Sequence, residues 1–160
     1  MKSTRLIQCF VFLALAVGVV SANGQAAAPV ACPWLTQGMA ARVLDGDVTV
    51  DVHVSYAGEG VCSFIRKSDT TTSLKLEVSK TALPACGADA MKLKGIGNEA
   101  LRCNMPATAD RAVEQISGRV RDRFFTLTMS HGKSAAASPH GDLQNDDLEQ
   151  AAESVAGNLF

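Results

Sequence analysis

Cysteine is the residue type in this sequence with the most defined chemistry. Cys9 lies in an apolar N-terminal run, and the other four are Cys32, Cys62, Cys86 and Cys103. Their spacing contains no Cys-x-x-Cys pair of the kind that holds structural zinc. In an exported chain, an even set of cysteines indicates disulfides. Of the three connectivities that four cysteines allow, we favour Cys32–Cys62 with Cys86–Cys103, because cysteines that follow one another flank elements expected to be neighbours in space.

Histidine and carboxylate side chains offer a second chemistry, the binding of a divalent metal. His131 and His140 flank a segment of small residues, and Asp142 follows it, so these three are weak candidate ligands. Metal sites usually hold their ligands on rigid elements, and we therefore expect an unligated polar loop and no metal here. His53 falls on the polar face of a predicted strand, where a solvated side chain is expected.

The motifs of the common enzyme classes are missing from the sequence. It contains no Gly-x-Ser-x-Gly, no His-Glu-x-x-His, no phosphate loop and no EF-hand loop. Gly95-x-Gly97 lacks the strand and helix of a phosphate cradle, so it predicts a tight turn. The acidic residues are scattered over turns and helix ends rather than paired. We therefore expect no enzymatic activity, no catalytic residues and no cofactor.

The N-terminus has the pattern of a secretory signal peptide. Lys2 and Arg5 precede an apolar run that ends at Val20 and is followed by small residues. This pattern predicts export to the periplasm or the medium, without a stable membrane anchor once the signal is removed. The expected organisation is a signal peptide over 1–22, an unstructured leader over 23–31 and a single domain over 32–160.

Alternation of apolar and polar residues predicts the strands that position these groups. Val48 to Tyr56 alternates without exception, and a turn returns the chain into Val61 to Ile65. A third strand around Leu74 to Val78 completes an antiparallel meander. Further strands are expected at Ala100 to Asn104, Arg111 to Val120 and Arg123 to Ser130.

Helices are expected at both ends of the domain. Thr36 is a candidate N-cap for a short helix that carries Met39 and Val43, and Asp142 to Phe160 is a longer amphipathic segment. Lys80 to Gly97 is expected to be an irregular loop with one helical turn around Ala85 to Leu93. The predicted fold class is α+β, with an antiparallel sheet of about six strands packed by an N-terminal and a C-terminal helix.

Three short motifs resemble a group of bacterial export domains. They are Cys-Pro-Trp-Leu-Thr at 32–36, Val-Cys-Ser-Phe at 61–64 and Gly-Ile-Gly-Asn-Glu-Ala at 95–100. Together with the closing helix, they resemble uncharacterised, mostly actinobacterial secreted and lipoprotein domains that open with Cys-x-x-Leu-Thr. The resemblance covers most of the expected domain and implies a PsbP-like sheet with flanking helices in an envelope protein without established catalysis. The chain departs from this group in lacking the lipid-attachment cysteine and in the cysteine arrangement of 80–94.

The charge balance excludes one class of partner. Fifteen basic and sixteen acidic residues give a net charge of −1, which leaves no basic excess for binding nucleic acid. We expect a monomeric, non-catalytic binding or interaction module, with an unknown envelope protein or a small ligand as its partner. The alternative is a small disulfide-stapled inhibitor or structural protein of the envelope, and an exported hydrolase is favoured least.

Two surface features are candidates for the working face. The segment Gly132 to Gly141 has small residues and no apolar anchor, and loops of this kind carry function on rigid scaffolds. Arg119, Arg121 and Arg123 stand at the tip of the last predicted hairpin, where they offer an anion site unless they are simply solvated. We expect the working face around this loop and hairpin, with a sheet edge or a cleft between sheet and helices as the other place for a ligand.

Overall fold

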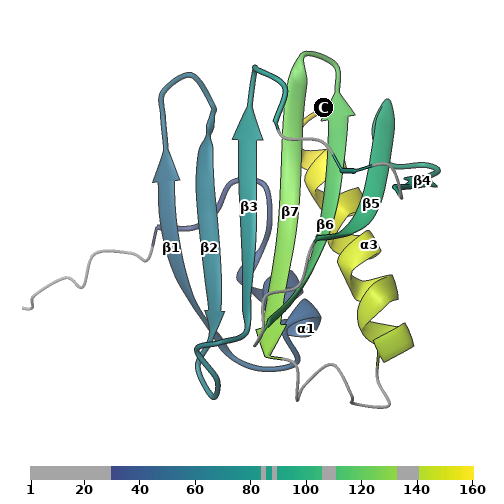
Figure 1. Ribbon diagram of the computed structural model, residues 1–160. Helices are drawn as coiled ribbons and strands as arrows, with labels where there is room; N and C mark the ends of the chain where they lie inside the picture. The colour runs from purple at the N-terminus through teal and green to yellow at the C-terminus, as the bar shows by residue number, and fades with distance from the viewer. Residues whose placement is uncertain (1–29, 84–85, 88–89, 106–110, 133–140) are drawn as a thin grey trace, which may run out of the picture.

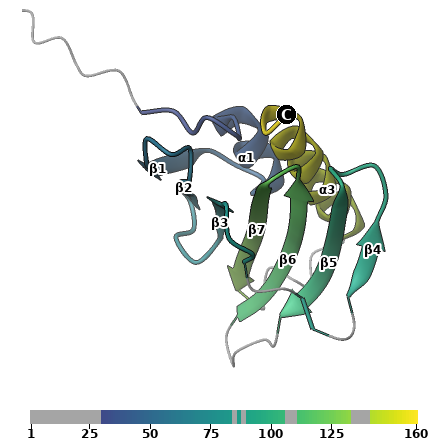
Figure 2. The same ribbon diagram turned by 90° about the horizontal axis from the view of Figure 1, so that it is seen from above.

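The fold is one antiparallel sheet with two helices on one face. The computed structural model describes residues 30–83, 86–87, 90–105, 111–132 and 141–160. The elements within them are α1 Gln37–Val43, β1 Val48–Val54, β2 Gly60–Arg66, β3 Ser73–Ser79, β4 Met91–Leu93, β5 Glu99–Met105, β6 Arg111–Val120, β7 Arg123–Gly132 and α3 Gly141–Asn158. The strand order is β1-β2-β3-β7-β6-β5-β4. The sheet curves around α1 and α3, and we call the face toward the helices the inner face (Figures 1 and 2).

The first three strands form the predicted meander, which is confirmed. β1 pairs with β2 and β2 pairs with β3, both antiparallel. Alternation places Cys62 and Phe64 of β2 beside Leu74 and Leu76 of β3 on the inner face, and all four are fully buried. The hydrophobic period of two therefore sets which face of the sheet meets the helices.

The number of strands differs from the prediction of about six, because β4 is a seventh. β4 lies within Lys80–Gly97, for which the sequence predicts a loop with one helical turn, and it pairs with β5. The helical turn is therefore wrong for Met91–Leu93. A strand of three residues has too few positions for a period of two to be visible in the sequence.

Both helices were expected, and each has a clear anchor. The Thr36 side chain accepts a hydrogen bond from the Met39 backbone N–H at 3.2 Å, so the predicted N-cap of α1 is confirmed. α3 buries Leu148, Ala152 and Val155 against the sheet and α1. No helix in the described part of the chain is long and apolar enough to span a bilayer.

The connection from β3 to β4 crosses the outer face of the sheet. β3 lies in the middle of the sheet beside β7, whereas β4 is the strand at the far edge. Ala82 and Leu83 of this connection share a small hollow with Leu101 and Phe124. The connection therefore covers part of the face that the helices leave open.

Two glycines with opposite surroundings give a first prediction about stability. Gly38 in α1 has open space where a Cβ would stand, whereas a Cβ on Gly118 of β6 would overlap the Phe125 ring. We expect Gly38→Ala to raise the free energy of unfolding by about 0.5–1 kcal/mol. Alanine has less conformational freedom than glycine in the unfolded chain, so less entropy is lost when the helix forms. Gly118→Ala should lower it by about 1–3 kcal/mol through overpacking. Chemical denaturation of both variants checks the signs, and a stabilised Gly118→Ala variant would contradict the packing.

Candidate functional site

A groove beside β1 opens on the inner face of the sheet. It has a volume of about 530 Å³, and its walls are Val30, Ala31, Cys32, Leu35, Thr36, Gln37, Val50, Asp51, Val52 and Phe64. Most of these residues are apolar, and the volume lies within the range of small-molecule sites. We call this opening the β1 groove.

A disulfide fastens one wall of the β1 groove to the sheet. Cys32, in the segment that leads into α1, is bonded to Cys62 of β2 with a Cα–Cα distance of 5.9 Å. Leu35 next to it is buried in the core, while Val50 and Val52 of β1 are only half-buried. The helices therefore leave the inner face of β1 incompletely covered, and the disulfide ties the segment on the other side of the opening to β2.

The edge of the sheet next to the groove has unused backbone groups. Ser55 donates its N–H to the Glu59 carbonyl at 2.8 Å, and Lys67 donates to the Asp47 carbonyl at 2.8 Å. Along an antiparallel strand, the backbone N–H and C=O groups of successive residues point alternately toward and away from the partner strand. The odd-numbered residues of β1 therefore form hydrogen bonds with β2, and the backbone groups of the even-numbered residues point away from it. The Val48 carbonyl accepts a hydrogen bond from Gln37 Nε2 at 2.9 Å. Among the described residues, no strand lies beside the outward groups of Val50, Val52 and Val54.

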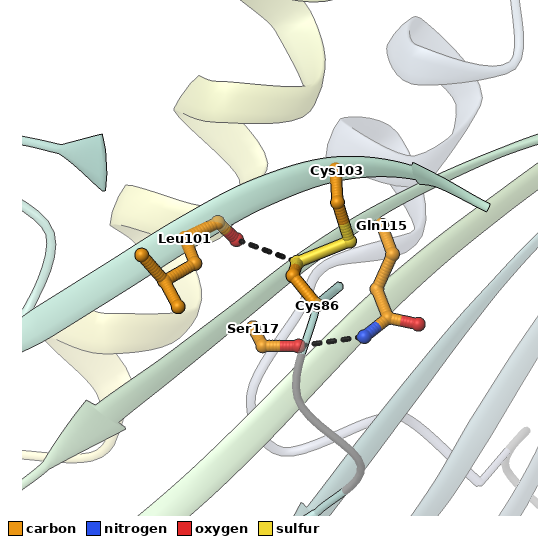
Figure 3. Close-up of a disulfide and its surroundings, with 5 residues drawn as sticks. All are labelled: Cys86, Leu101, Cys103, Gln115 and Ser117. Carbon is orange, nitrogen blue, oxygen red and sulfur yellow. Dashed lines mark hydrogen bonds between the residues drawn. A yellow bond between two sulfur atoms is a disulfide. The ribbon is translucent and has the colours of Figure 1, made fainter. Parts of the chain in front are cut away.

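Both disulfides are the pairs that the sequence favoured. The second joins Cys86 of the β3–β4 connection to Cys103 of β5, with a Cα–Cα distance of 5.6 Å. Cys103 lies on the outer face, and the Cys86 sulfur is 3.8 Å from the Leu101 carbonyl oxygen (Figure 3). This disulfide therefore fastens the connection to the sheet and takes no part in the β1 groove.

Of the three predicted metal ligands, the structure describes only the His131 side chain. His131 is buried on the inner face of β7, and its Nδ1 has no hydrogen-bond partner. His140 lies outside the described residues, as do residues 133–140 of the predicted working loop, and Asp142 falls within α3. No three His, Cys, Asp or Glu side chains of the described ranges lie close enough to hold a metal ion.

The three arginines of the last hairpin have protein partners instead of forming an open anion site. Arg119 pairs with Glu99 at 3.2 Å. Arg121 donates to the Phe160 carbonyl at 2.9 Å and stacks over the Phe160 ring at 5.2 Å. Arg123 donates to the backbone carbonyls of the β1–β2 turn at 2.7 and 2.9 Å. These contacts link the hairpin tip to the C-terminal residue and to the first hairpin.

Sequence reasoning missed a charged cluster between the sheet and α3. Arg102 of β5 lies 3.0 Å from Glu114 of β6 and 3.0 Å from Glu149 of α3, and the Arg102 side chain is only 14% exposed. Glu149 lies well inside α3, which begins at Gly141. None of these three residues lines the β1 groove, and their ion pairs link β5, β6 and α3.

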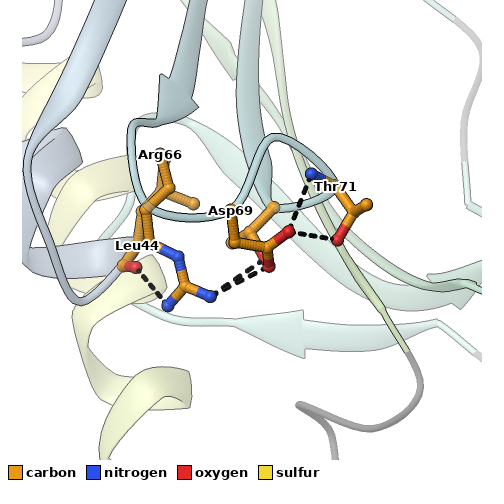
Figure 4. Close-up of polar contacts among 5 residues, drawn as sticks. Leu44, Arg66, Asp69 and Thr71 are labelled. Carbon is orange, nitrogen blue, oxygen red and sulfur yellow. Dashed lines mark hydrogen bonds and ion pairs between the residues drawn. The ribbon is translucent and has the colours of Figure 1, made fainter.

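A second polar cluster closes the β2–β3 turn. Asp69 accepts hydrogen bonds from the Thr71 hydroxyl at 2.6 Å, from the Thr72 hydroxyl at 2.6 Å and from the Thr71 N–H at 3.0 Å (Figure 4). Arg66 lies 3.0 Å from Asp69 and also donates to the Leu44 carbonyl at 3.3 Å. The hydroxyl of Thr71, then the other donors, hold the pKa of Asp69 well below its ordinary value.

This lowered pKa predicts how stability responds to acid. A carboxyl group with a lower pKa in the folded state contributes stability that is present above the unfolded pKa, about 3.9 for Asp, and is lost as the pH falls below it. We expect the thermal midpoint of the wild-type protein to fall more steeply between about pH 5 and pH 2 than that of Asp69→Asn. Thr71→Val, which removes the main donor, should give an intermediate slope. Equal slopes for wild type and Asp69→Asn would contradict this account.

No family model, curated protein or solved structure matches this chain. The resemblance to bacterial export domains therefore stays a prediction. The β1 groove combines about 530 Å³ of space with a mostly apolar lining, and it is the candidate functional site.

Proposed function

We propose that this chain is an exported, non-catalytic binding module that holds an apolar group in the β1 groove. The observation that carries the proposal is the groove itself, with about 530 Å³ of space between Leu35, Val50, Val52 and Phe64. Ligand sites are concave and mostly apolar, and usually present before the ligand binds. The ligand class is a small apolar molecule or an apolar side chain of an envelope protein.

Two further features support this function and its place in the cell. Two disulfides are compatible with an oxidising compartment outside the cytosol. One of them fixes the wall of the groove, so little ordering cost is left for the binding step. Export itself rests on the N-terminal pattern of Lys2, Arg5 and the apolar run to Val20.

A solvent-sensitive dye tests whether the β1 groove binds apolar groups. Anilinonaphthalene sulfonate should show saturable fluorescence enhancement with the folded wild-type protein. Val52→Trp places a large ring in the groove and is expected to weaken dye binding by about tenfold, the equivalent of 1.4 kcal/mol. Val54→Trp is the matched control, because Val54 lies on the same strand and face but outside the groove lining. Equal binding by the wild type and both variants would show that the site lies elsewhere.

A further inference from the structure

We propose that β1 pairs with the β1 strand of a second copy of this chain, which forms a two-fold symmetric dimer with one continuous sheet. This inference concerns the edge of the sheet and does not depend on the ligand proposed for the groove. It differs from the monomer that the sequence led us to expect.

The two edges of the sheet are built differently. β4 has only three residues, and its central residue, Lys92, is exposed. A short strand with a lysine is a common way to prevent edge pairing. β1 has seven residues, Val48–Val54, without lysine or proline. Only the β1 edge therefore lacks these protective features among the described strands.

The backbone of β1 is ready to accept another strand. The outward N–H and C=O groups belong to Val50, Val52 and Val54, as derived above, since the odd-numbered residues bond to β2. In a two-fold antiparallel pair, Val52 faces the second copy's Val52, and Val50 faces the second copy's Val54. Val54 is 42% exposed in the single chain, so this pairing gives it an apolar neighbour.

The charged residues of β1 select this register. Asp51 and His53 lie on the outer face, where His53 Nε2 is 3.1 Å from Asp51 Oδ2 and both side chains are mostly exposed. With Val52 opposite Val52, each Asp51 faces the second copy's His53, and the four side chains alternate between acid and base around a square. A shift by two residues would instead place the two Asp51 side chains opposite one another, and like charges there are unfavourable.

This reciprocity favours a second copy over an unrelated extended peptide. A foreign strand would need a basic group opposite Asp51, an acidic group opposite His53 and apolar residues in between. The β1 strand itself has this pattern when it runs in the opposite direction. The occupant of the edge is therefore another molecule of the same chain.

Sedimentation velocity of the full chain, purified with its disulfides formed, tests the dimer. As its concentration rises, the wild type should sediment increasingly as a dimer. His53→Asp creates a square of four acids and is expected to weaken dimerisation by at least about tenfold. Lys75→Gln is the control, because it removes a positive charge from the same face two strands away.

Exchange of the charged residues at positions 51 and 53 distinguishes a loss of charge pairing between the two strands from a general effect of the His53→Asp substitution. The double variant Asp51→His with His53→Asp restores the alternating square, so it should restore dimerisation. A wild type that stays monomeric at every concentration would overturn the proposal, as would a double variant that stays as weak as His53→Asp. Dye binding by the monomeric His53→Asp variant keeps the test of the groove separate, since His53 does not line the groove.

Discussion

Replacement of Cys32 and Cys62 by alanine is expected to lower the free energy of unfolding by about 3–4 kcal/mol. The disulfide closes a loop with a sequence separation of 30 residues, and its removal returns that chain entropy to the unfolded state. Unfolding in denaturant, followed by circular dichroism, measures the loss. It is a large effect, since small domains are stable by only about 5–15 kcal/mol in total.

The second disulfide is the matched comparison. Cys86 and Cys103 are separated by 17 residues, so their replacement by alanine should cost somewhat less, about 3 kcal/mol. Only the Cys32 and Cys62 variant should also weaken dye binding, because only that disulfide forms a wall of the β1 groove. A loss below about 1 kcal/mol for the first pair, or weakened dye binding for the second, would contradict these roles.

Arg102→Met is expected to lower the free energy of unfolding by about 2–4 kcal/mol. The substitution leaves Glu114 and Glu149 without the cation between them, in a place where the Arg102 and Glu114 side chains are largely shielded from water and Glu149 is partly exposed. Removal of one member of a buried ion pair leaves the other charge uncompensated, which costs more than loss of an exposed pair. Denaturant unfolding at neutral pH measures the difference.

Arg119→Met is the control for Arg102→Met. Arg119 and Glu99 also bridge a strand pair, but both side chains are largely exposed, so the expected loss is about 0.5 kcal/mol or less. A further variant, Arg102→Met with Glu114→Met, removes both charges and should be more stable than the sum of the single losses predicts. Equal losses for Arg102→Met and Arg119→Met would show that burial does not set the strength of this cluster.

Much of the fold could be predicted because local patterns determine it. The alternation along β1 and the Thr36 cap each depend on a few neighbouring residues, and both are present in the structure. The position of β7 between β3 and β6 depends on pairing between distant segments, which no local pattern reports. β4 was missed for another reason, since three residues carry no period.

The candidate site was harder to predict than the elements that form it. The sequence is compatible with a site at an exposed edge or in a cleft, but its small-residue segment favours a working face near Gly132–Gly141, much of which lies outside the described residues. The β1 groove depends on where the segment around Cys32 runs relative to β1, and it has no motif of its own. The signal available in the sequence was the alternating valine face of Val48–Val54, because a continuous valine face needs a cover that a short helix does not fully supply.

The position of β3 beside β7 has a consequence for the order of folding. Their paired residues, Ser73 with Ser130 through Ser79 with Phe124, are far apart in the chain, so this ladder is slow to close. Each disulfide lies on one side of this junction, Cys32–Cys62 before it and Cys86–Cys103 after β3, so neither can hold the two parts together. We therefore expect the β1–β3 meander to form early with one disulfide in place. Its β3 edge should stay unpaired until β7 has formed and packs beside it.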